Sequence, residues 1–298
     1  MESKDKKLAV AIARCENLVI AVRDESHPCH KVASFQVDTP NRHIPEAWFG
    51  NITDAQVLLI SSNPSIDLNE NVEGENYPRE SWGDDQISEW ITRRVDQSWA
   101  EVPVTFQRSP FKNFLWRCID GKYRGAGKGN QPQPTWNNTH KLVVELLGPS
   151  ANPSKNYALT EVVHCKSQKG IGVPEASPVC SANWLGKIMD LATNARVVVL
   201  LGSHVRPWAR DEYKNLVPKD FGKRVTAAGL EVAIRDSFVK GGRVYIYLPH
   251  PTAAEPGGRL PSTRFGTGVH QILAEIAKGV KAVPETTSEL HLLFRATR

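Results

Sequence analysis

The 298-residue chain has no long apolar run, no paired set of cysteines and no glycine-rich nucleotide-binding loop. No stretch of about 18 or more apolar residues occurs, so the sequence predicts no transmembrane helix. The first 18 residues are charged and then amphipathic, unlike the long apolar core of a secretory signal. The five cysteines are odd in number and scattered, unlike the disulfide framework of a small secreted domain. We therefore expect a cytoplasmic protein.

The chain also lacks internal repeats and both common phosphate-binding motifs, G-x-G-x-x-G and G-x-x-x-x-G-K-[ST]. A flavodoxin-like or nucleotide-binding α/β protein is one interpretation of the sequence, and the missing motifs argue against it. Lysine and arginine number 37 against 32 acidic residues, which gives a formal net charge of +5. This moderate basic excess is compatible with a polyanionic partner such as nucleic acid.

Four short aliphatic runs predict the strands of a mostly parallel sheet. Each run is too short for a helix and is followed by small, polar or proline residues, as buried strands are. The runs are Val57–Ile60, Ala158–Val163, Val197–Leu201 and Val244–Leu248. Helical spacing at Thr139–Leu147 and Asn183–Ala192 places helices between them. The alternation predicts a three-layer α/β/α sandwich around a central, mostly parallel four-stranded sheet.

No composition shift divides the chain, so we expect a single domain over residues 1–298. Within it, residues 1–40 read as an N-terminal helical segment and residues 285–298 as a C-terminal tail. The stretch Gly121–Pro134 (GKYRGAGKGNQPQP) has no apolar period and reads as a surface loop whose cations could contact phosphate.

Polar groups on proline-containing turns follow the first and the last apolar run. Asn63 stands in Ser61-Ser62-Asn63-Pro64-Ser65, and His250 lies between two prolines, followed by Thr252. In α/β folds the active site lies at the carboxyl ends of the strands. Each turn alone is common in ordinary loops, but the pair predicts a site where two strand ends deliver polar side chains.

At this point the sequence resembles the uracil-DNA glycosylase superfamily. VLLISSNPS resembles the family's first motif, a strand leading into Gly-x-Asn-Pro-Gly or Gly-x-Asp-Pro-Tyr, and LPHPTAA resembles its second, His-Pro-Ser-Pro or His-Pro-Ser-Ala. LTEVVHCKS is similar to the Thr-Asn-Val-Val-Lys-Cys-Arg segment of the iron–sulfur branch, families 4 and 5. The segments CSANWL, ARVVVLLGS, IPEAWFGN and GENYPRESW are also similar to family members. The matches keep the family's order from about residue 40 to about residue 270.

The resemblance implies a hydrolase that flips a nucleotide out of DNA and cuts the base from its sugar. It implies His250 as the group that hydrogen-bonds the departing base and Asn63 as the group near the attacking water. An amide cannot act as a general base, so Asn63 could only orient the water. We expect the aromatic side chain that stacks on the flipped-out base to be Tyr77, with Trp82 as the second choice.

The implied DNA contacts are hydroxyls on the two turns and cationic or apolar residues beyond His250. Leu260 is the candidate wedge that fills the vacated base stack, and Arg206 and Arg210 add to the positive charge near the strand ends. The full set of expected contacts is Ser61, Ser62, Ser65, Thr252, Arg259, Leu260 and Arg264. We expect DNA as the partner, no membrane, and a monomer.

Glu161 stands where the family has the asparagine that reads uracil. A carboxylate would repel O4 of uracil, whereas a protonated Glu161 can donate to N3 of cytosine and accept from its N4 amino group. Burial in an apolar strand is expected to raise the pKa of this carboxyl group. The hypothesis that follows is a cytosine-type base, in particular a modified one such as the glucosylated hydroxymethylcytosine of phage DNA. Phage-defence glycosylases that act on this base resemble this description.

Two alternatives stay open. Glu161 could be a lineage variant in a repair enzyme that removes uracil or hypoxanthine. From another class of protein, the chain could be a catalytically silent DNA-binding module that kept the fold.

Four cysteines raise the question of a [4Fe–4S] cluster, which the resemblance to family 4 implies. Cys165 and Cys180 match the later pair of family ligands in spacing, but Cys15 and Cys29 are further apart than the family's early pair. Four thiolates are the requirement, and the fold can bring them together from any spacing. Buried unliganded cysteines are common, and Cys118 reads as a core thiol. A cluster here would be structural, because glycosidic hydrolysis moves no electrons.

Overall fold

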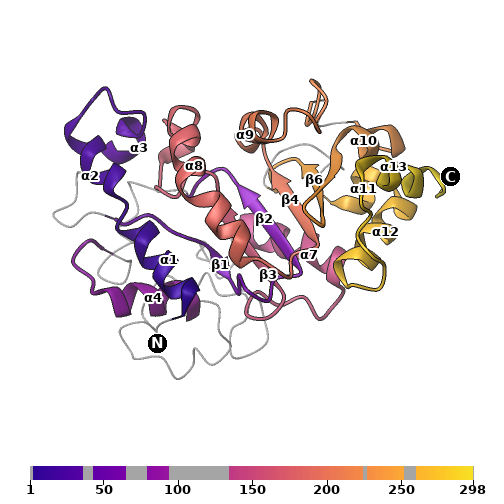
Figure 1. The fold of residues 1–298 in the computed structure, drawn as a ribbon, viewed down its shortest axis with the longest axis horizontal. Helices are drawn as coiled ribbons and strands as arrows, with labels where there is room; N and C mark the ends of the chain where they lie inside the picture. Colours follow the sequence, from indigo (N-terminus) through magenta and orange to yellow (C-terminus); the bar gives the residue numbers. More distant parts are fainter. Residues whose placement is uncertain are drawn as a thin grey trace.

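A computed structural model describes residues 3–35, 43–64, 79–93, 134–223, 227–251 and 260–297. Through these residues runs a six-stranded sheet in the order β1-β3-β2-β4-β6-β5 (Figure 1). None of the described helices is both long enough and apolar enough to cross a lipid bilayer.

The four central strands coincide with the four apolar runs of the sequence. They are β2 (Val57–Ser61), β3 (Tyr157–Glu161), β4 (Val197–Leu201) and β6 (Arg243–Leu248). Each pairs in parallel with its neighbour in the order β3-β2-β4-β6. Every residue of β2 and of β4 is buried, because parallel strands at the centre of a sheet are covered on both faces. The prediction of an α/β fold with a mostly parallel sheet is confirmed.

The prediction of four strands is wrong, because two antiparallel edge strands extend the sheet to six. β1 (Phe49–Gly50) pairs with β3, and β5 (Ser237–Lys240) pairs with β6. β1 has two residues and β5 has four, so neither forms an apolar run that a sequence pattern can detect. Both depend on an already formed neighbour strand for their pairing.

Helices cover both faces of the sheet, and each face has its own apolar core. One core is covered by α1 (Lys4–Ala13), α2 (Glu16–Arg23), α3 (His30–Ser34), α4 (Asp84–Arg93), α8 (Val173–Leu191) and α9 (Val205–Glu212). The other is covered by α7 (Pro134–Leu147), α10 (Leu230–Arg235), α11 (Pro261–Phe265), α12 (Thr267–Ala277) and α13 (Thr287–Arg295). Strand residues alternate between the cores, as the pleat of a strand requires: Leu58 and Ile60 face the first core, and Val57 and Leu59 face the second.

The two helices expected from the sequence lie inside α7 and α8. α7 begins five residues before the expected segment at Thr139 and ends with it at Leu147. α8 begins at Val173, ten residues before the expected start at Asn183, and ends one residue early at Leu191. In Figure 1, α1 to α4 and α8 lie to the left of β2, and α10 to α13 gather on the right of the view.

The strand order places a topological switch point between β2 and β4. From β2 the chain crosses through α7 to β3 on one side, and then through α8 to β4 on the other side of β2. In open α/β sheets, ligands bind outside the carboxyl ends of the strands at such a point. The residues that follow Ser61 of β2 and Leu201 of β4 are therefore the first place to look for function.

Alanine substitutions at two glycines test the pairing of β1 with β3 and the packing around α8. Gly50 has φ +94°, and a Cβ added there would lie 2.5 Å from the carbonyl oxygen of Tyr157 on β3. Gly50→Ala should therefore lower the free energy of unfolding by more than about 1 kcal/mol. Gly186 in α8 has nothing within 4 Å of the added Cβ, so Gly186→Ala should raise the free energy of unfolding by up to about 1 kcal/mol. Urea titrations of both variants measure the two shifts; a Gly50→Ala protein as stable as wild type would contradict the pairing of β1.

Candidate functional site at the strand ends

The chain segments after β2 and β3 stay paired beyond the strands themselves. Glu161, the last residue of β3, lies in register with Ser61, the last residue of β2. The Val162 amide donates to the Ser61 carbonyl oxygen at 3.0 Å, and the Val163 amide donates to that of Ser62, also at 3.0 Å. This extended pairing brings the Asn63 turn against the loop between β3 and α8.

The Asn63 side chain is held by two hydrogen bonds. Its Nδ2 donates to the carbonyl oxygen of Pro64 at 2.6 Å and to Oγ of Ser167 at 3.1 Å. The same Pro64 oxygen accepts from the Ser167 backbone amide at 3.1 Å. A carbonyl oxygen can only accept, so the amide group that faces Pro64 must be the NH2 group. The carbonyl Oδ1 of Asn63 is then the atom left to accept a hydrogen bond from a ligand or from water.

The His250 turn is anchored on both sides. The Asn138 side chain of α7 donates to the carbonyl oxygen of Pro251 at 2.8 Å. At the end of β4, Gly202 has φ +85°, and an added Cβ would lie 3.3 Å from Cβ of His250. The ring is half-buried and packs directly over the backbone of β4, which any larger residue at position 202 would crowd.

Burial lowers the pKa of His250, and the nearby charge of His204 lowers it further. His250 is therefore a neutral imidazole near pH 7, with one ring N–H to donate and one ring nitrogen to accept.

Sequence analysis did not single out His204, which this edge of the sheet also carries. His204 follows β4 directly and precedes the first turn of α9. Its Nε2 lies 3.1 Å from the position of a Cβ added at Gly170, so the ring packs against the backbone of the turn η4 (Gln168–Gly170). The available signal was its position, three residues after the third apolar run, since polar residues after a parallel strand lie at the functional edge.

Asn63, Glu161 and His250 thus share the carboxyl edge of one sheet. Their strands stand in the order β3-β2-β4-β6, so the strand ends at Glu161 and His250 are three strand spacings apart, about 14 Å. Asn63 and His204 follow the two strands between them. The edge therefore offers an acid, an amide and two imidazoles from four separate strand ends.

The hydroxyls expected to contact DNA differ in exposure. Ser61 is only 8% exposed, whereas Ser62 is half-buried and closer to the surface. Ser62 is therefore the more accessible hydroxyl of the two. The remaining expected residues of these loops lie outside the described part of the chain: Ser65, Tyr77, Thr252 and Arg259.

Trp82 and Leu260 are both engaged with the protein core. Trp82 is half-buried and packs against the first core, and its carbonyl oxygen accepts a hydrogen bond from Arg14. Leu260 is half-buried, precedes α11 and packs against the second core. Stacking by Trp82 or insertion of Leu260 into DNA would require each side chain to leave part of this packing.

Arg264 is corrected from a DNA contact to a core residue. It is fully buried, and its Nη2 lies 2.6 Å from Oδ2 of Asp236, which is fully buried as well. Arg235 binds the same carboxylate through Nε at 2.7 Å. A buried, paired guanidinium cannot reach a phosphate. The sequence could not reveal this, because Asp236 lies 28 positions away on the segment before β5.

The four cysteines expected as cluster ligands come together in the fold. Cys15 precedes α2, Cys29 precedes α3, Cys165 lies in the loop after β3, and Cys180 lies in α8. All four are buried free thiols. Each of the six pairs among them interacts electrostatically, so the four sulfur atoms lie in one neighbourhood. Cys118 lies outside the described residues.

Burial raises the pKa of three of these thiols, those of Cys29, Cys165 and Cys180, and so favours their protonated form. Desolvation, with a smaller contribution from Cys15, raises the pKa of Cys29 to about 11. Desolvation followed by the neighbouring thiols raises the pKa of Cys165, and desolvation is also the main cause of the raised pKa of Cys180. Within the described ranges, no group of three or more His, Cys, Asp or Glu side chains is arranged to hold a single metal ion. The thiolates that hold a four-iron cluster stand around a cube of iron and sulfide, further apart than the ligands of one ion.

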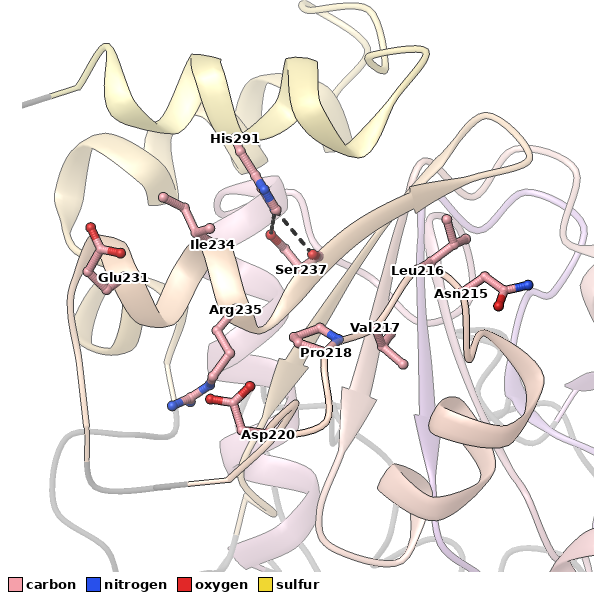
Figure 2. Close-up of a pocket in the computed structure, with 10 residues that line it drawn as sticks. All are labelled: Asn215, Leu216, Val217, Pro218, Asp220, Glu231, Ile234, Arg235, Ser237 and His291. Atoms are coloured by element: carbon pink, nitrogen blue, oxygen red, sulfur yellow. Dashed lines mark hydrogen bonds between the residues drawn. The ribbon is translucent and has the colours of Figure 1, made fainter.

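A surface pocket of about 540 Å³ is lined by none of these strand-end residues and lies between the loop after α9, α10, the start of β5 and α13 (Figure 2). His291 of α13 points at Ser237, with Nε2 3.3 Å from its carbonyl oxygen. The charged residues of the lining are Asp220, Glu231 and Arg235. The Arg235 guanidinium is paired with the carboxylate of the next residue, Asp236. The pocket therefore has no excess of positive charge that would suit a phosphate.

Comparison with known protein families found none that matches the chain, and comparison with curated proteins found no match.

The helix that anchors the His250 turn also carries a buried histidine whose titration can be measured. His140 is 7% exposed with Nδ1 3.1 Å from the Tyr157 hydroxyl, and burial lowers its pKa to about 4. Between pH 6.5 and about 4 the unfolded chain binds a proton at this residue that the folded chain does not. The free energy of unfolding should therefore fall as the pH falls, by up to about 1.4 kcal/mol per pH unit from this group. His140→Gln should flatten the pH dependence measured by urea titration; an unaltered slope would argue against a neutral buried His140.

Proposed function

We propose that the protein is a DNA glycosylase that hydrolyses the N-glycosidic bond of a flipped-out base and leaves an abasic site. The observation that carries the proposal is that Asn63, Glu161 and His250 come from three strand ends on the same carboxyl edge of one sheet. The motif order that resembles the uracil-DNA glycosylase superfamily supports it, and the finer fold proposed is the three-layer sandwich of that superfamily.

The chemistry requires stabilisation of negative charge on the departing base and an oriented water molecule. A neutral His250 supports the first need, because its ring N–H can donate to the base oxygen as the glycosidic bond breaks. Asn63 supports the second, because Oδ1 can accept a hydrogen bond from the attacking water. The amide takes up no proton, so bond breaking precedes attack on an oxocarbenium-like sugar, and the proton that the water loses ends on the departing base anion.

Glu161 selects the base in this proposal. It ends β3, is half-buried and lies in register with the β2 strand that leads to Asn63. As a carboxylic acid it would donate to N3 of a cytosine-type base and accept from the N4 amino group. Excision of ordinary cytosine would damage the cell's own DNA, so we propose a modified cytosine such as the glucosylated hydroxymethylcytosine of phage DNA, and a role in antiviral defence.

The four buried thiols are proposed to hold a structural [4Fe–4S] cluster. The donor set fits, since Cys15, Cys29, Cys165 and Cys180 are four free cysteines from four segments. When bound, the cluster supplies only cross-linking, and the residues that it would tie are the N-terminal helices and the loop after β3. Protonated thiols with raised pKa values gain nothing from mutual proximity, whereas a metal cluster stabilises the deprotonated form.

The panel of possible bases separates the candidate functions. Duplex and single-stranded oligonucleotides carrying uracil, hypoxanthine, cytosine, hydroxymethylcytosine or its glucosylated form are incubated with the protein, and base release is followed. We expect release of a modified cytosine, with His250→Ala slower by about 100-fold to 1,000-fold. Release of uracil or hypoxanthine alone would favour a repair enzyme. DNA binding without any product would favour the catalytically silent DNA-binding module.

The same assay tests Glu161. Glu161→Asn should move release from the cytosine-type base toward uracil, by at least about tenfold in the ratio of rates, because a paired donor and acceptor discriminate by about 1–3 kcal/mol. Glu175→Gln is the matched control, since Glu175 is an exposed acid of α8 that pairs with Lys31. An unchanged ratio in Glu161→Asn would contradict the assignment of Glu161 to base recognition.

The cluster is tested by colour and by analysis of the protein. Anaerobically purified protein should be brown, absorb at about 400 nm and contain about four iron and four sulfide per chain. Cys165→Ser and Cys29→Ser should each lose the absorbance, and Cys118→Ser should keep it. Colourless protein without iron from cells supplied with iron and sulfur would refute the cluster and leave the four residues as core thiols.

A further inference from the structure

We infer that Ser167 is a positioning residue of this site, which holds the Asn63 amide so that its carbonyl oxygen faces the attacking water. The inference rests on the glycosylase function proposed above. The sequence does not suggest Ser167, since a serine in a loop has no signature of its own.

The contacts of Ser167 converge on one carbonyl and one amide. Its backbone N–H donates to the Pro64 carbonyl oxygen at 3.1 Å, and its Oγ accepts from Nδ2 of Asn63 at 3.1 Å. Asn63 Nδ2 donates to the same Pro64 oxygen at 2.6 Å. The three groups form a closed set in which each position depends on the other two.

This set leaves the amide of Asn63 no freedom to rotate. A primary amide has two N–H hydrogens, and here each has its own acceptor. Rotation of the amide by 180° would place Oδ1 against the Pro64 carbonyl oxygen and break both hydrogen bonds. The planar group therefore presents Oδ1 in one direction, which is the preorganisation that an oriented nucleophile requires.

Ser167 is itself fixed by its surroundings. It is fully buried, while Asn63 is only half-buried, so the hydroxyl forms the interior support of a side chain that reaches the surface. Its φ of −146° and ψ of 153° are ordinary extended values, so no backbone strain accompanies this placement. It follows Cys165 by two residues in the loop that the proposed cluster would tie to the N-terminal helices. The position of this loop therefore determines, through Ser167, the position of the Asn63 side chain.

The alternative is that Ser167 only fills space in the core. A space-filling serine would affect folding, and through folding every property of the protein to the same degree. A residue that acts through Asn63 would affect the chemical step, leave DNA affinity unchanged and lose its effect once Asn63 is removed.

The test is a double-mutant cycle on single-turnover base release, using the base that the wild-type protein releases. Ser167→Ala should slow release about tenfold, with the DNA dissociation constant within about twofold of wild type. Asn63→Ala and the double variant Asn63→Ala/Ser167→Ala should release the base at equal rates. Ser181→Ala is the control, because Ser181 is also buried but its hydroxyl donates to Ser177 within α8; its rate should equal that of wild type. A Ser167→Ala effect that persists without Asn63 would overturn the inference.

A second measurement needs no activity. In nitrogen-15 spectra the Asn63 side-chain NH2 pair is assigned by its loss in Asn63→Ala. We expect slow hydrogen exchange for this pair in the wild-type protein and at least about tenfold faster exchange in Ser167→Ala, or in the nearly isosteric Ser167→Cys if the alanine variant does not fold. An unchanged exchange rate in the folded variant would overturn the positioning role. A wild-type protein that releases no base, yet shows this exchange difference, would refute the glycosylase proposal and leave the positioning role standing.

Discussion

The parallel pairing of β2 with β3 and β4 is the constraint on which the site depends. Ser61 and Glu161 are in register at the ends of β2 and β3, and the pairing continues into the following residues through the amides of Val162 and Val163. A shift of one residue in this register would turn every side chain of β3 to the other face of the sheet. It would also separate Asn63 from Ser167. The positions of the amide and the acid are therefore set by the same hydrogen bonds that hold the centre of the sheet together.

The part of the carboxyl edge that carries His250 is held by contacts other than the pairing of β2 with β3. The His250 turn is stabilised by α7 through Asn138, and Gly202 allows the imidazole to pack against the end of β4. Asn138 lies on a regular helix, which positions a side chain more accurately than a free loop does, and Gly202 directly follows the last residue of β4. The imidazole and the amide are thus supported separately, the imidazole turn by α7 and the end of β4 and the amide by Ser167 in the loop after β3.

Burial of polar groups costs free energy, and the fold contains two examples. The carboxylate of Asp236 lies in the core with Arg264 and Arg235, and such a pair is stable only if both partners stay together. The four thiols are a second example, because burial raises the pKa of Cys29 and Cys165 and makes the free thiolate unfavourable. The carboxylate of Asp236 is neutralised within the protein by its two arginine partners. A metal group bound by the thiols would give them a comparable partner.

The sequence by itself determined the four central strands and the polar residues that end them. Aliphatic runs and proline turns are local patterns, so they identify Asn63 and His250 without any knowledge of the strand order, and the resemblance to the glycosylase superfamily adds Glu161. The tertiary structure alone decided that order, the two short edge strands, the burial of Arg264 and the gathering of the four thiols. It also decided that Ser167, 104 positions from Asn63, supports the amide, and that His204 lies beside His250. These features join residues far apart along the chain, and the free energy of such contacts exists only after the sheet and its two layers of helices have packed.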